Sequence, residues 1–250
     1  MSATVAIPAR LRSARLPDKL LLDIAGRTLL RRTHDVAQAA ECGPVIVLTD
    51  SDEIAAEVRA FGGEVQMTAA DLDSGTARIA SVADRFDTDV VVNLQGDAPL
   101  TAPGVVAAAA SEAERTGAPV TMAVYPLTRP EDVADPNTVK VVRARGGRVL
   151  YCSRAAIPHV RDDPLQAALD RSLHWGHSGI YAYSRGFLSG FGQIPASTLE
   201  QTERLEQLRW LEAGLEVGSF EVEPQGPSVD TPEQLERVRA EFAAREGRAG

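Results

Sequence analysis

Residues 4–19 of the chain read TVAIPARLRSARLPDK, and this stretch introduces the fold. Residues 4–7 are all apolar or β-branched, which favours a short strand. Pro8 ends that strand because proline has no backbone N–H to donate to a neighbouring strand. The loop that follows, residues 8–19, contains a second proline and four basic side chains. The chain therefore opens with a strand that leads directly into a basic loop.

The segments after this loop alternate between helix and strand patterns. Helices are predicted from apolar residues at helical spacing within residues 29–40, and over residues 52–60 and 75–86. Strands are predicted at residues 45–49, 64–68 and 89–94. The resulting β-α-β-α-β-α-β order predicts an open, Rossmann-like α/β fold with a mostly parallel sheet and helices on both faces. Ligands of such sheets bind beyond the carboxyl ends of the strands, where Asp50, Asp97 and the 8–19 loop would lie.

The pattern changes after residue 118, where a mixed α+β region follows. Strands are predicted at residues 119–127, 138–143, 179–184 and 215–222, with a hairpin strand at 148–153 and a helix at 198–213. The last helix has clear start signals, with Thr231 as N-cap and Pro232 at the first helical position. We therefore expect a nucleotide-binding α/β core made of residues 1–117 and 224–250. Residues 118–223 would form the inserted region, with the site in the groove between the two parts.

Composition and charge limit the classes of function. The chain has 250 residues with 44% hydrophobic and 24% charged residues, an ordinary globular balance. Its net charge of −9 argues against a nucleic-acid partner. No apolar run approaches the roughly 20 residues that span a bilayer. Two distant cysteines exclude a disulfide scaffold and offer no zinc-site spacing. The expected protein is soluble and cytoplasmic.

Positive charge is nevertheless concentrated at the start of the chain. The first forty residues contain seven basic and three acidic residues, a net charge of +4, which predicts a site for a small polyanion. Only Lys19 and Lys140 are lysines, so position 19 is a candidate for a compact ammonium group rather than a guanidinium. The loop has neither the spacing of a Walker A loop nor that of a dinucleotide fingerprint. Taken alone, it is either a phosphate cradle or a solvated basic loop.

A series of motifs resolves this choice by resemblance. The pattern P-A-R-x-x-S-x-R-L-P-x-K of residues 8–19 is followed by DSGT (73–76), VNLQGDAP (92–99), PNTVKVV (136–142), YCSRAAIP (151–158), HSGIYAY (177–183), LEQLR (205–209) and VDTPE (229–233). In this order, over nearly the whole chain, the motifs resemble the CMP-Kdo synthetase (3-deoxy-manno-octulosonate cytidylyltransferase) family of sugar nucleotidyltransferases. The resemblance implies an enzyme that joins the anomeric hydroxyl of an acidic 2-keto-3-deoxy sugar to the α-phosphorus of CTP and expels pyrophosphate. It also implies lipopolysaccharide biosynthesis and a homodimer built on the inserted region.

The resemblance assigns nucleotide, metal and catalytic residues. Those for CTP are Pro8, Ala9, Arg10, Arg15, Lys19, Ser74, Gly75, Arg78 and Gln95. Asp97 and Asp230 would hold Mg²⁺, a hard cation that takes carboxylate, water and phosphate oxygens. Lys19, Asp97 and Asp230 would form the catalytic group, with Lys19 close to the α- and β-phosphates. The two aspartates also have structural alternatives, Asp97 as a turn or helix cap and Asp230 as a favourable charge at a helix N-terminus.

The resemblance also assigns a sugar site. Its members are Arg154, His177, Tyr181, Glu206 and Gln207, with Arg154 on the sugar carboxylate and the others on hydroxyls. His177 could equally be a structural histidine. Glu206 and Gln207 could simply lie on the solvated face of the 198–213 helix.

The chain departs from the family pattern at two positions. Ala77 and Ala98 stand where the family usually has glutamate, and residues 161–175 also differ. Loss of two carboxylates leaves two alternatives to the main function. One is activation of another acidic sugar, such as 8-amino-Kdo or a sialic-type acid, and the other is a nucleotide-binding regulator without turnover.

Overall fold

The structure is a computed structural model that describes residues 2–11 and 15–246. Its strands are β1 (Thr4–Ala9), β2 (Asp23–Ile24), β3 (Arg27–Thr28), β4 (Val45–Thr49), β5 (Glu64–Met67), β6 (Val90–Asn93), β7 (Val120–Pro126), β8 (Lys140–Arg143), β9 (Val149–Ser153), β10 (Trp175–Ser184) and β11 (Val217–Glu221). The helices are α1 (Leu29–Ala39), α2 (Asp52–Ala60), α3 (Gly75–Ala80), α4 (Pro103–Thr116), α5 (Pro130–Ala134), α6 (Leu165–Asp170), α7 (Arg185–Gly190), α8 (Thr198–Glu203), α9 (Gln207–Glu212) and α10 (Pro232–Glu246). Short 3₁₀ helices cover Lys19–Leu21, Ala83–Arg85 and Phe191–Gln193.

β1 lies in the middle of the main sheet, whose order is β11-β7-β10-β6-β1-β4-β5. β5, β4, β1 and β6 are parallel to one another, β10 is antiparallel to β6 and β7, and β11 is parallel to β7. β8 and β9 extend the sheet from β10. The predicted α/β fold with a mostly parallel sheet is confirmed. The sheet continues from β6 to β10, so strands of the 118–223 segment extend the same layer, and the division into two domains stays a prediction.

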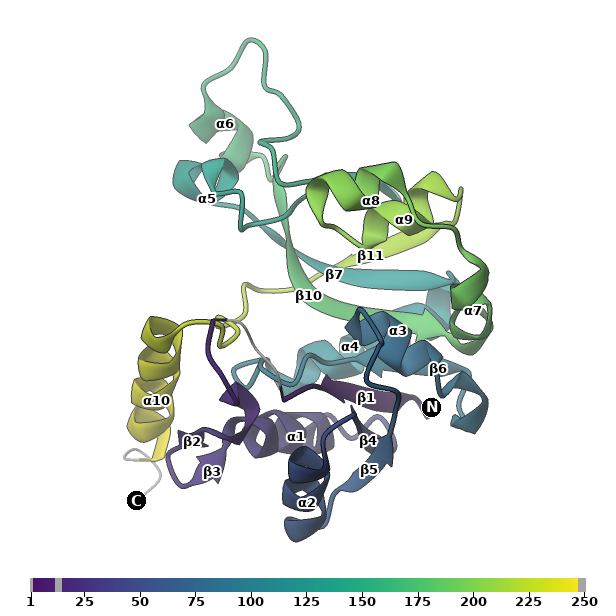
Figure 1. Cartoon of the computed structure of the whole chain (residues 1–250). Helices are drawn as coiled ribbons and strands as arrows, with labels where there is room; N and C mark the ends of the chain where they lie inside the picture. Colours follow the sequence, from purple (N-terminus) through teal and green to yellow (C-terminus); the bar gives the residue numbers. More distant parts are fainter. Residues whose placement is uncertain (1, 12–14, 247–250) are drawn as a thin grey trace.

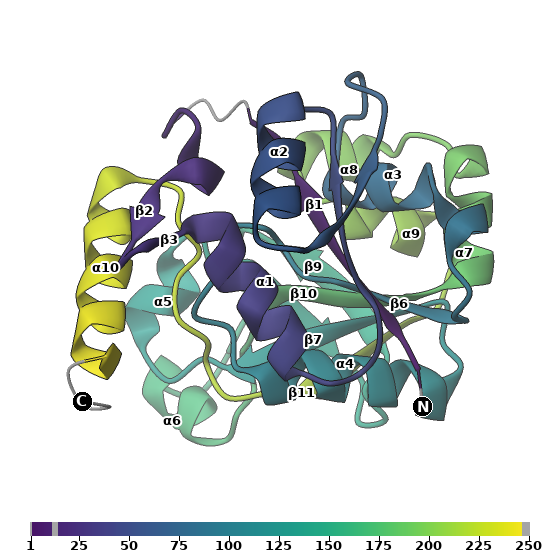
Figure 2. The same ribbon diagram turned by 90° about the horizontal axis from the view of Figure 1, so that it is seen from below.

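Helices cover both faces of the sheet, which is why its central strands are almost wholly apolar. Val5 and Ile7 of β1 pack with residues of α1, α2, α4 and α10 in one core cluster, whereas Ala6 faces a second cluster that includes Ile79 of α3 and Trp210 of α9. In Figure 1, α1 and α2 lie below β1 and α3 lies above it, and Figure 2 shows α1 crossing the lower face. No helix in the described ranges is long and apolar enough to cross a membrane.

Four predicted elements differ from the structure. The prediction that Pro8 ends the first strand is wrong, because β1 continues to Ala9 and Pro8 pairs with Leu48. Beyond Ala6 the strand pairs only with β4, so the missing N–H of Pro8 is tolerated there. The helix predicted at 198–213 is two helices, α8 and α9, because Arg204 adopts a left-handed conformation with φ of 56°. The helix predicted at 75–86 ends at Ala80 and continues as a separate 3₁₀ turn. The strand predicted at 179–184 begins earlier, at Trp175, and contains an irregularity between His177 and Tyr181. The sequence patterns also gave no sign of the β2–β3 hairpin.

His177 lies at the start of the irregularity in β10 and is partly buried. The Nε2 atom of this side chain is shielded from solvent and has no hydrogen-bond partner in the described part of the chain. Burial lowers the pKa of His177 to about 4, below the value of about 6.5 expected in an unfolded chain. Between these two values the unfolded chain binds a proton that the folded chain does not, so His177 makes stability fall as pH falls.

We expect the protein to lose roughly 1–2 kcal/mol more stability between pH 7 and pH 5 than its His177→Gln variant loses over the same interval. Urea unfolding of both proteins at the two pH values measures the difference. Equal losses in the two proteins would contradict a buried, neutral His177.

Candidate functional site

A cavity of about 300 Å³ lies beyond the carboxyl ends of β1 and β6. Its walls come from the loop after β1, the start of α3, the segment after β6 and the segment before α10. The lining residues are Pro8, Ala9, Arg10, Arg15, Lys19, Leu20, Leu72, Asp73, Ser74, Gly75, Arg78, Gln95, Gly96, Asp97 and Asp230. Every residue predicted for nucleotide, metal or catalysis therefore lines one cavity. Arg12, the remaining basic residue of the predicted loop, lies outside the described residues.

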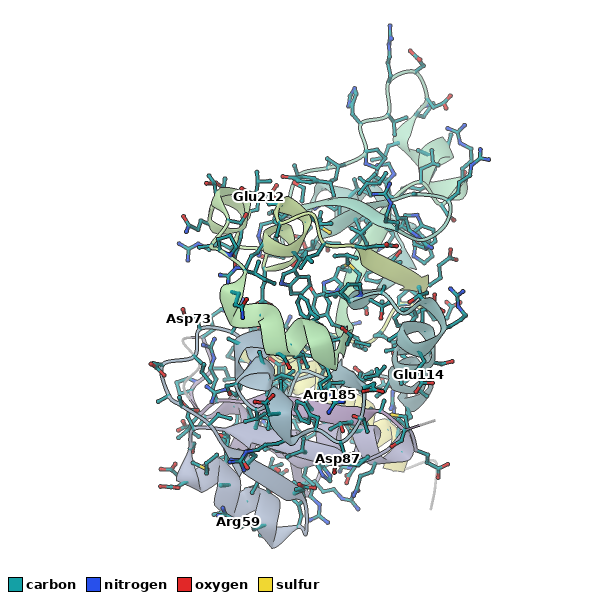
Figure 3. All side chains as sticks on the ribbon, turned by 90° about the vertical axis from the view of Figure 1, so that its right-hand side faces the viewer. Arg59, Asp73, Asp87, Glu114, Arg185 and Glu212 are labelled. Atoms are coloured by element: carbon teal, nitrogen blue, oxygen red, sulfur yellow. The ribbon has the colours of Figure 1, made fainter. Side chains whose placement is uncertain are left out.

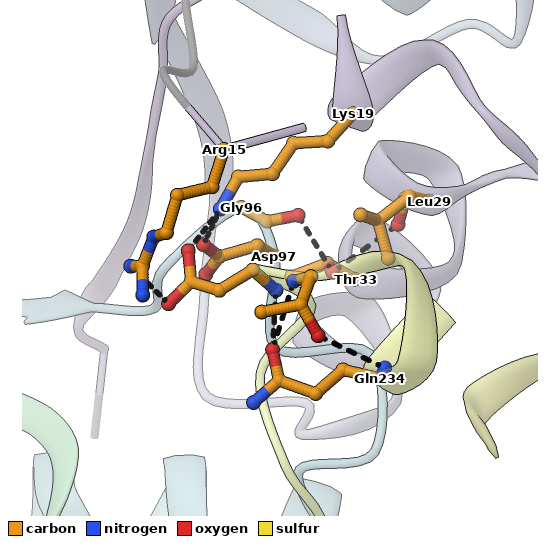
Figure 4. A network of polar contacts seen from close by, with 9 residues as sticks. Arg15, Lys19, Leu29, Thr33, Gly96, Asp97 and Gln234 are labelled. Carbon is orange, nitrogen blue, oxygen red and sulfur yellow. Dashed lines mark hydrogen bonds and ion pairs between the residues drawn. The ribbon is translucent and has the colours of Figure 1, made fainter. Parts of the chain in front are cut away.

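Lys19 is at the centre of a cluster of charges in this cavity (Figure 4). Its Nζ atom lies 2.5 Å from Oδ2 of Asp97 and 2.8 Å from Oδ1 of Asp230. Arg15 approaches the other oxygen of Asp230 at 3.0 Å. Burial alone would lower the pKa of Lys19, but the two carboxylates outweigh it, so the pKa is raised above its ordinary value. Lys19 is thus held as a cation between two carboxylates.

Backbone and capping interactions bring the two aspartates to this point. The N–H of Val229 donates to the carbonyl of Asp97 at 2.9 Å, which ties the segment before α10 to the end of β6. At the start of α10, Oε1 of Gln234 accepts from the N–H groups of Asp230 and Thr231, and the N–H of Gln234 donates to the hydroxyl of Thr231. This reciprocal pattern is a capping box, so the start of α10 fixes the backbone of Asp230.

A hydroxyl from α1 fixes the other half of the cluster. Oγ1 of Thr33 is buried and donates to the carbonyl oxygens of Gly96, at 3.0 Å, and Leu29, at 3.2 Å (Figure 4). Gly96 directly precedes Asp97, so α1 holds the turn on which that carboxylate stands.

The opposite wall of the cavity is close-packed around Gly75. A Cβ atom at this position would lie 3.1 Å from Cγ of Pro8 and 3.4 Å from Nε2 of Gln95, so the backbone approach favours glycine. Gln95 donates to Oδ1 of Asn93 at 3.1 Å. Arg78 is buried and donates to the Thr68 hydroxyl and the Ala69 carbonyl, with Asp50 at 3.5 Å.

A second cavity, of about 690 Å³, adjoins the first and shares Leu72, Asp73 and Ser74 with it. Its other lining residues are Asp71, Ala77, Phe191, Glu200, Gln201, Arg204, Glu206 and Arg209. Figure 3 shows Asp73 at the side of the molecule, between the lower layer and the part that carries Glu212 of α9. Ala77, one of the two departures from the family pattern, therefore lines this second cavity. Ala98, the other, packs against the core cluster that contains Val5 and Ile7 of β1.

Glu206 is the predicted sugar residue that lines this second cavity. Its two carboxylate oxygens accept from the hydroxyls of Ser74 and Thr76, each at 2.5 Å. Burial raises the pKa of Glu206, although these two hydrogen bonds and the charge of Arg209 act in the opposite direction. The alternative of a solvated helix face is wrong for both residues, because Gln207 is buried and the half-buried Glu206 has both carboxylate oxygens hydrogen-bonded.

The other predicted sugar residues divide into two groups. Tyr181 donates to Oε1 of Gln207 at 3.3 Å, and the His177 ring lies 4.6 Å from the Tyr181 ring, so these three lie together where β10 meets the start of α9. Arg154 lies apart, at the end of β9, where its guanidinium donates to the carbonyls of Glu203 and Pro136. Of the five, only Glu206 is among the lining residues named for either cavity.

Several residues of the two cavities were not singled out from the sequence. Leu72, Asp73 and Gly96 adjoin or belong to the DSGT and QGD motifs, so their position next to predicted residues was the available signal. Thr76, Asn93 and Tyr183 also stand in the quoted motifs, but nothing in the pattern reveals that their side chains meet.

The cavity offers oxygen ligands suited to a divalent cation. In residues 2–11 and 15–246 there is no cluster of three or more His, Cys, Asp or Glu side chains that could hold a metal. Asp97 and Asp230 nevertheless converge on the same point, the Lys19 ammonium. Two carboxylates fit Mg²⁺, which commonly takes one or two from the protein and completes its shell with water and substrate phosphates.

Comparisons with known proteins identify the family. A family model described as cytidylyltransferase matches residues 4–217. The chain is 45% identical over 246 residues to a 3-deoxy-manno-octulosonate cytidylyltransferase of Syntrophotalea carbinolica, covering 96% of this chain and 98% of the relative. It is 40% identical over 243 residues to the enzyme of the same name from Escherichia coli, covering 96% of both chains.

A solved structure agrees with these relatives. It is a CMP:2-keto-3-deoxy-manno-octonic acid synthetase complexed with CTP, 38% identical to this chain, with a TM-score of 0.91 and coverage of 98% of this chain and all of the other. The resemblance carried by the motifs is confirmed. With a family model over most of its length and relatives this similar from end to end, the chain belongs to the 3-deoxy-manno-octulosonate cytidylyltransferase family.

Proposed function

We propose that this protein is an enzyme that transfers CMP from CTP to the anomeric hydroxyl of 3-deoxy-manno-octulosonate (Kdo), releasing pyrophosphate. The product, CMP-Kdo, would serve lipopolysaccharide biosynthesis. The observation that carries the proposal is the convergence of Arg10, Arg15 and Lys19 with two carboxylates in one cavity at the carboxyl ends of β1 and β6. The printed names of the relatives and the CTP complex of the similar structure support the substrates.

The cations of the cavity suit the charge changes of this reaction. The sugar hydroxyl oxygen forms a bond to the α-phosphorus while the bond from that phosphorus to the bridging oxygen breaks, so negative charge grows on the leaving pyrophosphate. Arg10 and Arg15 would bind the triphosphate tail, and Lys19 would lie beside the α- and β-phosphates. Such chemistry depends on positioning and on neutralising charge more than on covalent catalysis by the protein.

Asp97 and Asp230 would hold the divalent cation, which we propose to be Mg²⁺. When bound, it would polarise phosphoryl oxygens and lower the pKa of the attacking hydroxyl. Lys19 bridges both carboxylates, and Arg15 also pairs with Asp230, so these cations would keep the two aspartates in place while a metal ion and a triphosphate exchange at the site.

The sugar acid would bind in the second cavity, next to the proposed CTP site. Ser74 lines both cavities, and Glu206 offers acceptor oxygens to sugar hydroxyls. His177, Tyr181, Gln207 and Arg154 stay proposed sugar residues. Alanine at position 77 in this wall is the observation behind the alternative substrates, which are other 2-keto-3-deoxy acids such as 8-amino-Kdo or a sialic-type acid.

A cytoplasmic location and a homodimer complete the proposal. CTP is a cytoplasmic metabolite, so its user would work there. The 118–223 region carries Leu150 and Leu173, which are 46% and 43% exposed and would be covered in a dimer built on this region. Sedimentation of the purified protein would give twice the mass of one chain, and a single-chain mass would refute the dimer.

The activity itself is tested by following pyrophosphate release from CTP and Mg²⁺ with Kdo, 8-amino-Kdo and a sialic acid in parallel. Kdo should give the largest kcat/KM. A preference for either other acid would replace the proposed sugar but keep the cytidylyltransferase chemistry. CTP binding by calorimetry without turnover on any sugar would instead favour the nucleotide-binding regulator.

Lys19→Ala should lower kcat about a hundredfold or more, because it removes the cation beside the leaving group and leaves two carboxylates facing each other. The matched control is Arg27→Ala, which removes an exposed cation of the same segment that pairs with Asp35 outside the cavity. Thermal unfolding checks that both variants are folded. A Lys19→Ala enzyme with wild-type kcat would refute the assigned role.

Asp97→Asn should raise the Mg²⁺ concentration needed for half-maximal activity by roughly tenfold or more, since an amide is a poorer ligand than a carboxylate. The backbone carbonyl of Asp97 keeps its bond from Val229, so the segment should stay in place. Magnesium titrations of activity compare this variant with Asp35→Asn, an aspartate outside the cavity. Unchanged magnesium dependence would exclude Asp97 as a ligand.

A further inference from the structure

A continuous line of hydrogen-bonded side chains connects the two cavities. Oε2 of Glu206, in the second cavity, lies 2.5 Å from Oγ1 of Thr76, which lies 2.9 Å from the hydroxyl of Tyr183. Nδ2 of Asn93 lies 3.3 Å from the same hydroxyl, and Oδ1 of Asn93 lies 3.1 Å from Nε2 of Gln95. Gln95 lines the first cavity, the one that contains Lys19. The line therefore joins a proposed sugar residue to a proposed nucleotide residue.

The three middle members are sealed inside the protein. Thr76, Asn93 and Tyr183 are each no more than 2% exposed. Buried polar groups must find their partners within the fold, so each of these side chains depends on its neighbours in the line. If one of these side chains loses or reverses a hydrogen bond, its neighbour must reorient or be left without a partner.

The chemistry of the groups gives the line a single direction. Both carboxylate oxygens of Glu206 accept hydrogen bonds, one from Ser74 and the other from Thr76, so the one hydrogen of the Thr76 hydroxyl points to Glu206. Thr76 must then accept from Tyr183, and the Tyr183 oxygen, its own hydrogen spent, must accept from Asn93.

The same direction reaches Gln95. Because Asn93 donates its amide nitrogen to Tyr183, its oxygen faces Gln95 and needs a donor there. Nε2 of Gln95 supplies it, whereas a reversed Gln95 amide would bring two carbonyl oxygens together. Gly75 and Pro8 pack along this nitrogen side, since a Cβ at Gly75 would lie 3.4 Å from Nε2. With Nε2 bonded to Asn93, Oε1 is the remaining acceptor of a side chain that lines the first cavity.

We propose that Tyr183, together with Thr76 and Asn93, is a positioning residue that fixes the Gln95 amide so that its oxygen accepts a hydrogen bond from a bound substrate. This inference rests on the proposed function for the identity of the substrates. Their donor groups near the cavity are the exocyclic amino group of cytosine and the hydroxyls of the sugar acid. Uracil has a carbonyl oxygen where cytosine has the amino group, so the two sources can be separated.

The test is Tyr183→Phe, which removes only the hydroxyl that donates to Thr76 and accepts from Asn93. We expect about a tenfold loss, the scale of one hydrogen bond, in one of two quantities. If the donor is the cytosine amino group, the preference for CTP over UTP in kcat/KM falls and the KM of the sugar is unchanged. If the donor is a sugar hydroxyl, the KM of the sugar rises and the CTP to UTP preference is unchanged.

A background variant decides whether the effect passes through Gln95. In Gln95→Ala, adding Tyr183→Phe should cause no further change in the affected quantity, because the amide that Tyr183 orients is gone. An undiminished effect in that background would overturn the proposal. So would a Tyr183→Phe enzyme that matches wild type, or one indistinguishable from Tyr125→Phe, the same deletion on a half-buried tyrosine of β7 outside the line.

A second variant, at Thr76, tests the same hydrogen-bonded line if Tyr183→Phe does not fold. Thr76→Val keeps the shape of the side chain and removes the hydroxyl, so it should affect the same quantity as Tyr183→Phe, and no effect in a folded variant would count against the proposal. Dissociation constants for CTP and UTP, measured by calorimetry, test the nucleotide arm without turnover. An inactive wild-type protein would therefore refute the proposed function while leaving that arm able to support or overturn the role of Tyr183.

Discussion

The placement of the Lys19 ammonium between Asp97 and Asp230 is the constraint on which the site depends. The two carboxylates come from segments 133 positions apart in the sequence and would repel each other at this separation without a cation. One ammonium, carried by the loop after β1, satisfies both. The loop, the end of β6 and the start of α10 are thereby joined at a single point, and all three contribute to the walls of the first cavity.

Much of this arrangement could be predicted from the sequence because of where the residues stand. Pro8, Gln95 and Asp97 each lie at or just after the end of a strand, and parallel strands bring their carboxyl ends to one edge. The apolar runs of β1, β4 and β6 therefore fixed both the sheet and the location of the cavity. Asp230 was predicted through its motif, since its approach to Asp97 depends on the Val229 backbone bond, which leaves no local pattern.

The rest depended on contacts that no local pattern encodes. Arg204 takes a left-handed conformation without being glycine, and the break it makes between α8 and α9 lets Glu206 reach Ser74 and Thr76. A helical repeat of leucines cannot reveal that break, because the bonds that favour it come from residues about 130 positions away. The same holds for Tyr183. Its sequence pattern indicates an ordinary core aromatic residue, and only the fold shows that its hydroxyl meets Thr76 and Asn93.

The capping box at the start of α10 links the order of synthesis to the chemistry. Gln234 and Thr231 hold the backbone of Asp230, and all three are made after every strand of the sheet. A chain still emerging from the ribosome can pair its strands and form the loop after β1, yet it lacks one of the two carboxylates. The segment before α10 is therefore the last part of the charge cluster to be made, and a nascent or truncated chain without it lacks the contact of Asp230 with Lys19.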